Sequence, residues 1–215
     1  MRGHYRGGVV AEVGTVRTVR AVARTVDHNA RRDEVAALAT GLIARGGIDA
    51  ATVRDIAAAG GYSTKVVSRY FSDKQELLLL VYRAAAERAR RRLMAARTRA
   101  GDDVLACTDA LLPLDDERRA DWAIWLAFWG MAVSDPSFSR EQRRRVRSTR
   151  KFLGAVIENA VAAGELPEDT DAEWMAAELL TAVNGVAVQA LFDPLDWPVD
   201  RQQAMVRAHY SRVTG

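Results

Sequence analysis

The residues with the clearest chemistry lie in the segment "TKVVSRYF" at positions 64–71. Polar and apolar residue types are spaced there in a way that predicts a short amphipathic helix. Its outer face would carry Thr64, Lys65, Ser68 and Arg69. Hydroxyl, ammonium and guanidinium groups can donate hydrogen bonds to phosphate oxygens and to base edges. The pattern therefore predicts a surface that contacts a nucleic acid.

The elements that would position this surface are two short helices joined by a tight turn. Thr52 is expected to cap the first helix, "TVRDIAAA", and Ser63 is expected to cap the second. Gly61 can adopt the positive φ that the turn needs. Ile56 on the first helix can then pack against Val67 on the second. This is the helix-turn-helix pattern, whose second helix enters the major groove of DNA.

A long helix is expected to follow, from Ser72 or Asp73 to about Arg97. Lys74 would lie beside the exposed amides at the N-terminus of that helix, where a phosphate is bound favourably. The alternative for the whole stretch is three helices that pack together and bind no nucleic acid.

The segment "TVRDIAAAGGYSTKVVSRYFSDKQELL" resembles the TetR family of repressors, and the likeness covers about residues 31–80. It includes the Thr cap, the "DIA" core, the Gly-aromatic-Ser turn and "YFSDKQELL". Many family members have a Tyr where this chain has Ser68. The "VVSRYF" form and the later "LLPLDDERRADWAIWLAFWGMAVSDP" resemble the BetI-like branch of the family, the second over about residues 105–193.

The resemblance implies an all-helical two-fold dimer that represses transcription and releases a palindromic operator when a small molecule binds. The first three helices would bind DNA, the fourth would couple the domains, and the last two would pair across the dimer. Carried onto matching positions, the DNA-contact candidates are Thr52, Arg54, Ser63, Thr64, Lys65, Ser68, Arg69, Tyr70 and Lys74. Tyr70 could equally be half-buried packing and Arg54 a solvated side chain, whereas Phe71 is expected in the core.

Three indoles predict a ligand site in the C-terminal part. Trp122, Trp125 and Trp129 recur at spacings of three and four and therefore share one helix face. Val133 would extend that face and Phe128 would lie off it. The stripe could line a pocket or simply fill the core. The candidate lining residues are Leu111, Trp122, Trp125, Trp129, Phe138, Phe152 and Trp174.

Two ligand classes fit such a pocket, an apolar molecule or a cation held over the indole faces. The BetI-like resemblance points to a quaternary amine such as choline.

An apolar stripe on the helix expected at 171–192 predicts a dimer interface, since a two-fold assembly needs a self-complementary surface. Ala182 and Gly185 near its centre are small enough to allow close helix approach. The candidate interface residues are Leu179, Ala182, Val183, Val186, Ala187 and Ala190. The alternative is core within one chain, because periodicity does not identify the partner of a buried face.

The composition agrees with an all-α fold of about nine helices. Of 215 residues, 49% are hydrophobic and only 5 are Pro, and no strand-like alternation persists. The first helix is expected at about 31–45. Residues 1–30 would form a flexible basic arm, 31–75 the helix-turn-helix DNA-binding domain, and 76–215 the helical ligand-binding and dimerisation domain. The five last helices are expected at about 103–112, 115–134, 136–164, 171–192 and 199–213.

Charge is distributed unevenly. Residues 1–100 hold 19 Lys and Arg against 9 Asp and Glu, a balance of +10, whereas residues 101–215 hold 12 against 19, a balance of −7. A basic N-terminal part favours a polyanion as its partner. The competing explanation is the solvated face of one Arg-rich helix around residues 88–99.

Other classes of protein are disfavoured. The three histidines, His4, His28 and His209, are scattered, and no phosphate-binding Gly-rich loop or metal-ligand spacing occurs, so we expect no enzyme, cofactor or metal site. The single Cys107 excludes an intramolecular disulfide, and no apolar run suits a signal peptide or membrane span, so a cytoplasmic location is expected. The remaining alternative is an architectural protein that binds DNA without reading its sequence and without a ligand.

Overall fold

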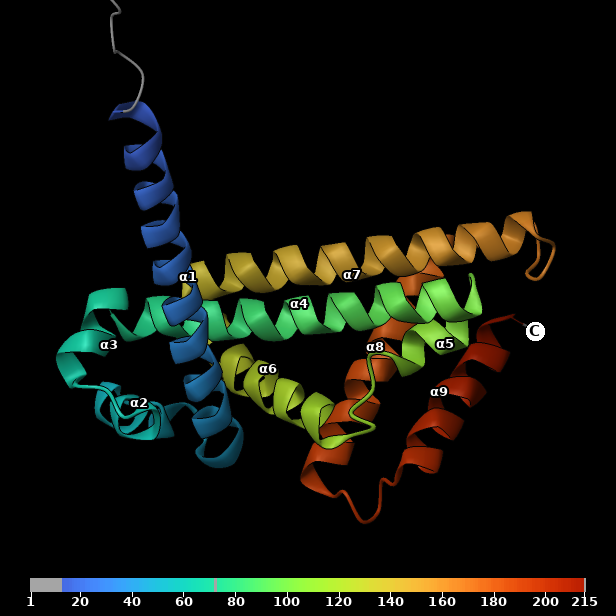
Figure 1. The fold of residues 1–215 in the computed structure, drawn as a ribbon. Helices are drawn as coiled ribbons and strands as arrows, with labels where there is room; N and C mark the ends of the chain where they lie inside the picture. Colours follow the sequence, from blue (N-terminus) through green and yellow to red (C-terminus); the bar gives the residue numbers. More distant parts are fainter. Residues whose placement is uncertain (1–12, 72, 215) are drawn as a thin grey trace, which may run out of the picture.

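The computed structural model describes residues 13–71 and 73–214, with side chains from residue 30 onwards. Over these ranges the fold is all-helical, which confirms the predicted class (Figure 1). The elements are α1 (Val13–Gly46), a short 3₁₀ helix (Ile48–Ala50), α2 (Val53–Gly60), α3 (Thr64–Tyr70), α4 (Lys74–Ala100), α5 (Val104–Asp109), α6 (Asp116–Ser134), α7 (Pro136–Ala162), α8 (Ala172–Phe192) and α9 (Val199–Thr214).

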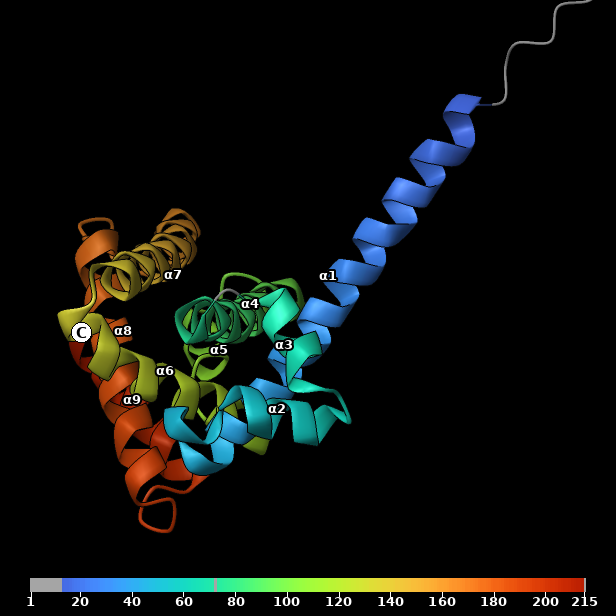
Figure 2. The same ribbon diagram turned by 90° about the vertical axis from the view of Figure 1, so that its left-hand side faces the viewer.

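The first helix is much longer than predicted. α1 begins at Val13, so residues 13–30 continue the helix and do not form the predicted flexible arm. Neither Gly nor Pro occurs between Gly14 and Gly41 to interrupt it. The N-terminal part of α1 projects away from the other helices (Figure 2). Residues 1–12, the rest of the predicted arm, lie outside the described residues.

One end of the molecule is a lobe made by α1, α2 and α3 (Figure 1). Val35 and Ala39 on α1, Ile56 on α2 and Val67 on α3 are at most 1% exposed and share one core. Burial of an aliphatic side chain of this size stabilises the fold by roughly 1.5–3 kcal/mol. Phe71 joins this core at 7% exposure, as the sequence predicted.

The rest of the chain forms a helical body that α4 and α6 connect to this lobe. α4 packs on α1, α5 and α6, and α6 also contacts α1, α7 and α8. The long helices α4 and α7 run along the body, and α8 and α9 pack on each other (Figures 1 and 2). Any displacement of α4 or α6 would therefore reach the lobe directly.

The apolar stripe of α8 is core within the single chain, which corrects the predicted dimer interface. Leu179, Val183, Ala187 and Ala190 are 0% exposed and Val186 is 7% exposed. They are covered by the helices that α8 contacts, which are α5, α6, α7 and α9. The sequence pattern marked a buried face correctly, but the elements that bury it belong to the same chain.

α8 is also the one described helix whose length and composition would allow it to cross a membrane, with a mean hydropathy of 1.5. No such segment was expected from the sequence. Its apolar character has a simpler cause here, since its buried face packs on four other helices of the body.

Candidate nucleic-acid interface and tryptophan cluster

The turn between α2 and α3 is built as the sequence predicted. The Thr52 hydroxyl accepts a hydrogen bond from the backbone N–H of Asp55 at 3.2 Å and so caps α2. Gly61 ends α2 with φ 66°, in the left-handed region that favours glycine. Ser63 occupies the N-cap position of α3, although its hydroxyl makes no capping hydrogen bond. The orientation of α3 on α2 is thus set by local backbone chemistry and by the shared core.

The predicted outer face of α3 is exposed. The candidates that the structure places on the surface of the lobe are Thr52, Arg54, Ser63, Thr64, Lys65, Ser68, Arg69 and Lys74. Tyr70 differs, because it is half-buried and packs against the core. The structure therefore brings eight of the nine candidates to solvent, from the start of α2, from α3 and from the start of α4.

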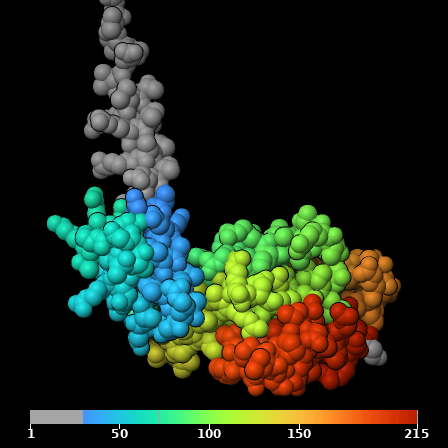
Figure 3. All heavy atoms as spheres, turned by 60° about the horizontal axis from the view of Figure 1, so that its bottom comes forward, coloured from blue at the N-terminus to red at the C-terminus, as the bar shows by residue number. Residues whose placement is uncertain are grey.

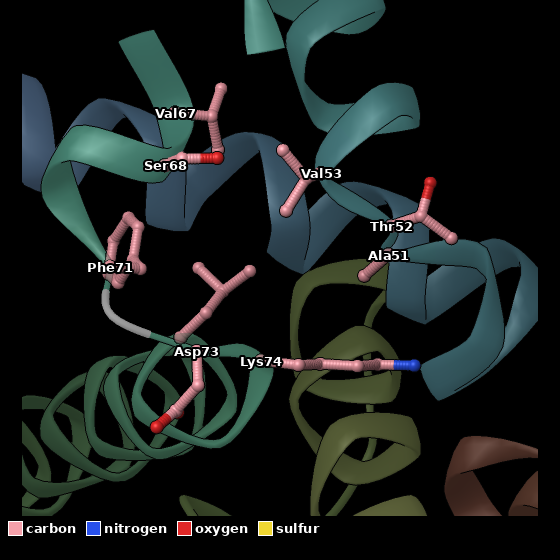
Figure 4. A pocket seen from close by; sticks show the side chains of 9 residues that line it. Ala51, Thr52, Val53, Val67, Ser68, Phe71, Asp73 and Lys74 are labelled. Atoms are coloured by element: carbon pink, nitrogen blue, oxygen red, sulfur yellow. The ribbon is translucent and has the colours of Figure 1, made fainter. Parts of the chain in front are cut away.

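Lys74 lies at the first turn of α4, beside a small cavity. Asp73 caps that helix by accepting a hydrogen bond from Glu76 N at 2.7 Å. The cavity, of about 260 Å³, lies between α2, α3 and the start of α4, and its lining includes Val53, Ser68 and Lys74 (Figure 4). Lys74 Nζ is 3.3 Å from Asp49 Oδ1, and both side chains are largely exposed. An exposed pair of this kind contributes little stability, so Lys74 can exchange it for a phosphate at low cost.

A polar network that the sequence analysis missed holds the turn against α1. The Tyr62 hydroxyl donates to Glu34 and accepts from Arg31 at 2.8 Å. The hydrogen bond to Glu34 raises the pKa of Tyr62 above its ordinary value. Arg32 also forms an ion pair with Glu76 and so joins α1 to α4. The i, i+3 spacing of Arg31 and Glu34 signals a helix-surface pair, but it carries no information on Tyr62.

The tryptophan cluster (Trp122, Trp125 and Trp129 on α6) is largely core. Trp122 is 2% exposed and Trp125 0% exposed, whereas Trp129 is only partly buried. Trp122 lies edge-on to Trp125 and Trp129, with ring centroids 5.0 and 5.9 Å apart, and its Nε1 donates to the Leu111 carbonyl at 2.8 Å. Of the two explanations for the stripe, filling of the core accounts for Trp122 and Trp125 in this chain.

Phe128 was predicted to lie off the tryptophan face, and Val133 was predicted to extend it. Phe128 is buried, stacks on Tyr82 with centroids 3.8 Å apart, and meets Phe138 at 4.4 Å. Val133 is 89% exposed and so does not extend the buried tryptophan face. Phe138, a predicted lining residue, therefore belongs to an aromatic group around Phe128.

Two other predicted lining residues lie away from the cluster. Phe152 is partly buried under the Arg97 guanidinium, 5.9 Å from its ring, and is on the order of 20 Å along α7 from Phe138. Trp174 is 65% exposed in the first turn of α8. Leu111, by contrast, is buried and meets Trp122 directly. Sequence separation alone could not show which aromatic residues share a neighbourhood.

Charged side chains surround the cluster, and sequence reasoning did not single them out. Asp121 is 0% exposed and pairs with two arginines of α4, at 2.9 Å from Arg88 Nε and 2.8 Å from Arg92 Nη2. The Arg145 guanidinium of α7 lies 3.7 Å from the centroid of the Trp125 ring. The available signal for Asp121 was its i, i+4 spacing to Trp125. Arg145 belongs to the run "RRRVR" at 143–147. A run of arginines is typical of a solvated helix face, so nothing in the sequence distinguished Arg145 from its neighbours.

Cys107 is a structural thiol. It is 0% exposed, and burial raises the pKa of its thiol to about 11. Because only the thiolate reacts readily, we expect an aromatic disulfide reagent at pH 8 to leave the folded protein unmodified and to react within the mixing time after unfolding in guanidinium. Absorbance of the released thiol measures both rates. Rapid modification of the folded protein would contradict this assignment.

Comparisons with known proteins agree on one family. Residues 36–81 match the description "Bacterial regulatory proteins, tetR family", and residues 100–215 match "BetI-type transcriptional repressor, C-terminal". The regulator PksA from Bacillus subtilis is 24% identical over 88% of this chain and 93% of its own length. The regulator BetI from Burkholderia cenocepacia is 28% identical over 76% of this chain and 82% of its own length.

Solved structures show the same fold. A transcriptional regulator from Rhodococcus sp. Rha1 is 28% identical, covers 85% of this chain and 95% of its own, and superposes with a TM-score of 0.73. One from Saccharomonospora viridis, in complex with choline, is 22% identical, covers 85% and 96%, and has a TM-score of 0.78. The exposed helix-turn-helix and the two family matches lead to one conclusion: this chain belongs to the TetR family of regulators, with a BetI-type C-terminal region, and is a DNA-binding transcriptional regulator.

Proposed function

We propose that this protein is a dimeric repressor that places α3 in the major groove of a palindromic operator and leaves it when a small molecule binds the helical body. The observation that carries the proposal is the exposed polar face of α3, held on the buried α2–α3 core. Base readout would come from Lys65, Ser68 and Arg69, and phosphate contacts from Thr52 and Lys74. Family members act on DNA in the cytoplasm, and we propose the same location here.

The Lys74 contact can be tested by salt dependence. Lys74→Ala should weaken binding to all sequences and flatten the plot of log affinity against log salt by about one unit per lost contact, or about two per dimer. The matched control is Lys151→Ala, because Lys151 is an exposed lysine far along the body on α7. This control should change neither the affinity for DNA nor the slope of the salt plot. Fluorescence anisotropy with labelled operator at several salt concentrations measures the slope. Equal slopes in the two variants would show that Lys74 does not contact the DNA.

Base readout needs a separate comparison. Lys65→Ala should cost roughly 1–3 kcal/mol on the operator for each lost base contact and much less on unrelated DNA. Equal losses on both DNAs would make Lys65 a phosphate contact. Equal affinity of the unaltered protein for operator and unrelated DNA would instead favour an architectural protein and overturn the proposal.

We place the dimer interface on the outer α8 face and the adjoining surface of α9. The outer α8 face is the side opposite to the core stripe and consists of Thr181, Ala182, Gly185, Gln189 and Phe192. Ala182 is the predicted interface residue that stays partly exposed. Phe192 is 71% exposed, and Met205 on α9 is 45% exposed. The two helices form a continuous surface on one side of the body (Figure 3). An apolar surface with small residues at its centre suits a two-fold helix–helix contact.

The effector would act through the body. A ligand changes operator affinity only if it binds two conformations of the dimer unequally, with a typical coupling of about 1–3 kcal/mol. α4 offers the mechanical path, because it begins at Lys74 and packs on α1 and α6. The choline complex of the Saccharomonospora viridis protein supports a small effector in this fold. The sequence analysis proposed an apolar or quaternary ammonium ligand on the tryptophan cluster, a proposal that the charged side chains around that cluster call into question.

A further inference from the structure

A partly open cavity of about 390 Å³ lies between α4 and α7, and we call it the α4–α7 cavity. Its charged lining comprises four arginines and two glutamates, which leaves an excess of two positive charges. The charged residues are Arg83, Glu87, Arg90, Glu141, Arg144 and Arg145. The two helices that line it are both basic, since α4 carries 8 Lys and Arg against 2 Glu and α7 carries 7 against 2, although residues 101–215 as a whole are acidic.

Both glutamates are already paired with arginines other than Arg145. Glu141 lies 3.0 Å from Arg83 and 2.6 Å from Arg144. Glu87 lies 2.8 Å from Arg90. Within the described part of the chain, Arg145 forms no ion pair of its own. The buried Asp121 carboxylate also acts on its charge, but Asp121 is already paired with Arg88 and Arg92.

The surroundings of Arg145 make that charge unusual. Its guanidinium lies 3.7 Å from the centroid of the Trp125 ring, and the Tyr82 hydroxyl is its hydrogen-bonding neighbour. Burial lowers the pKa of Arg145 from its ordinary value. Arg145 stays partly exposed, and an indole face and a neutral hydroxyl compensate its charge less well than an anionic partner would. A planar guanidinium also carries five donors, more than these two neighbours can use.

The tryptophan cluster under Arg145 also holds indole donors without an acceptor. The Nε1 atoms of Trp125 and Trp129 are buried without a hydrogen-bond partner, whereas Nε1 of Trp122 has the Leu111 carbonyl. Buried donors are normally satisfied, so each exception needs an explanation. Neither indole belongs to the lining of the α4–α7 cavity, so the group that a ligand there would pair with is the Arg145 guanidinium.

We propose that the α4–α7 cavity binds a small molecule through a carboxylate or phosphate group that pairs with Arg145, and that this anion is the effector. The assignment rests on the proposed function for its regulatory meaning and names the chemical class of the ligand. Guanidinium forks match the two oxygens of such groups in a bidentate fashion. The ligand would join α7 to α4, the helix that begins at Lys74.

A quaternary amine fits this site poorly. The Arg145 guanidinium already occupies one face of the Trp125 ring, so a second cation could use that face only by displacing it. The excess positive charge of the cavity lining would also repel a cation. The same chemistry that recommends an anion therefore argues against choline in this chain.

Binding can be measured with simple probes on the full-length protein. Acetate, benzoate and inorganic phosphate are titrated while unfolding temperature and tryptophan emission are followed, with choline as the probe of opposite charge. We expect at least one of the anions to raise the unfolding temperature and to change the emission, and choline to do neither. Benzoate and phosphate separate an organic carboxylate from a phosphate source. Binding of choline alone, or of none of the four probes, would overturn the proposal.

Arg145→Gln should weaken binding of the anion by roughly tenfold or more, the usual effect of losing a charged hydrogen bond. Arg147→Gln removes the same charge from an exposed position on α7 and is the matched control. If Arg145→Gln does not fold, Ser148→Glu provides a second test, because Ser148 is an exposed residue of the cavity lining and a carboxylate there repels the probe. Equal anion affinity in the control and in either cavity variant would overturn the assignment.

Operator affinity is a separate readout. Loss of DNA binding on anion addition, abolished by Arg145→Gln, supports both the site and its regulatory role. Anion binding that leaves operator affinity unchanged would contradict the effector role of the anion, but the anion-binding site in the α4–α7 cavity would stand. Sequence-specific operator binding with no anion binding would overturn the anion site and leave the DNA-binding function standing.

Discussion

Asp121→Ala is expected to lower the free energy of unfolding by about 3–5 kcal/mol, the usual cost of breaking a buried ion pair by removing one partner. Asp121 is 0% exposed, and its two oxygens face Arg88 and Arg92 on α4. Both arginines are largely buried, with 23% and 18% of their side chains exposed. Removing the carboxylate would leave two guanidinium groups close together between α4 and α6, with only the exposed Glu117 near them.

Glu117→Ala is the matched control for this variant. Glu117 approaches the same two arginines, at 3.9 Å from Arg88 and 3.5 Å from Arg92, but 67% of its side chain is exposed. An exposed pair contributes about 0–1 kcal/mol, so the control should be nearly neutral. Chemical denaturation followed by circular dichroism measures both values. Similar small losses in the two variants would show that solvent reaches Asp121 and that the pairing is not buried in solution.

Gly185→Arg should convert the dimer into monomers and lower operator affinity by about 10²–10⁴-fold, since the second half-site is then no longer bound as part of the same complex. A Cβ added at Gly185 meets no other atom within 4 Å, so the substitution leaves the packing of one chain intact. In a dimer formed by the outer α8 face, however, it would introduce two bulky cations close to the two-fold axis.

Gly130→Arg is the control for this experiment. Gly130 is an exposed glycine within α6, and a Cβ there also meets nothing within 4 Å. Both substitutions should raise helix propensity by up to about 1 kcal/mol. Sedimentation velocity at micromolar concentration reports assembly, and a labelled operator reports affinity. A Gly185→Arg protein that still sediments as a dimer would move the interface away from α8.

The lengths of most helices could be predicted because their ends are signalled locally. Thr52 and Asp73 cap α2 and α4 through their own side chains, and Asp135 followed by Pro136 separates α6 from α7. Such signals act over a few residues and need no tertiary structure. The start of α1 was missed because residues 13–30 contain neither a strong cap nor a regular apolar stripe, so the helix had no local marker.

The sequence by itself determined the fold class, the helix-turn-helix with its exposed polar face, and the family. These depend on periodicity, caps and turn residues, which are written in consecutive positions. Only the tertiary structure decided what covers each apolar face and which charges meet. It buried the stripe of Leu179 and Val183 within one chain, left Trp174 on the surface, and set Arg145 over Trp125. A helical pattern specifies which side of a helix avoids water, but the neighbour that excludes the water is chosen by packing of the whole chain.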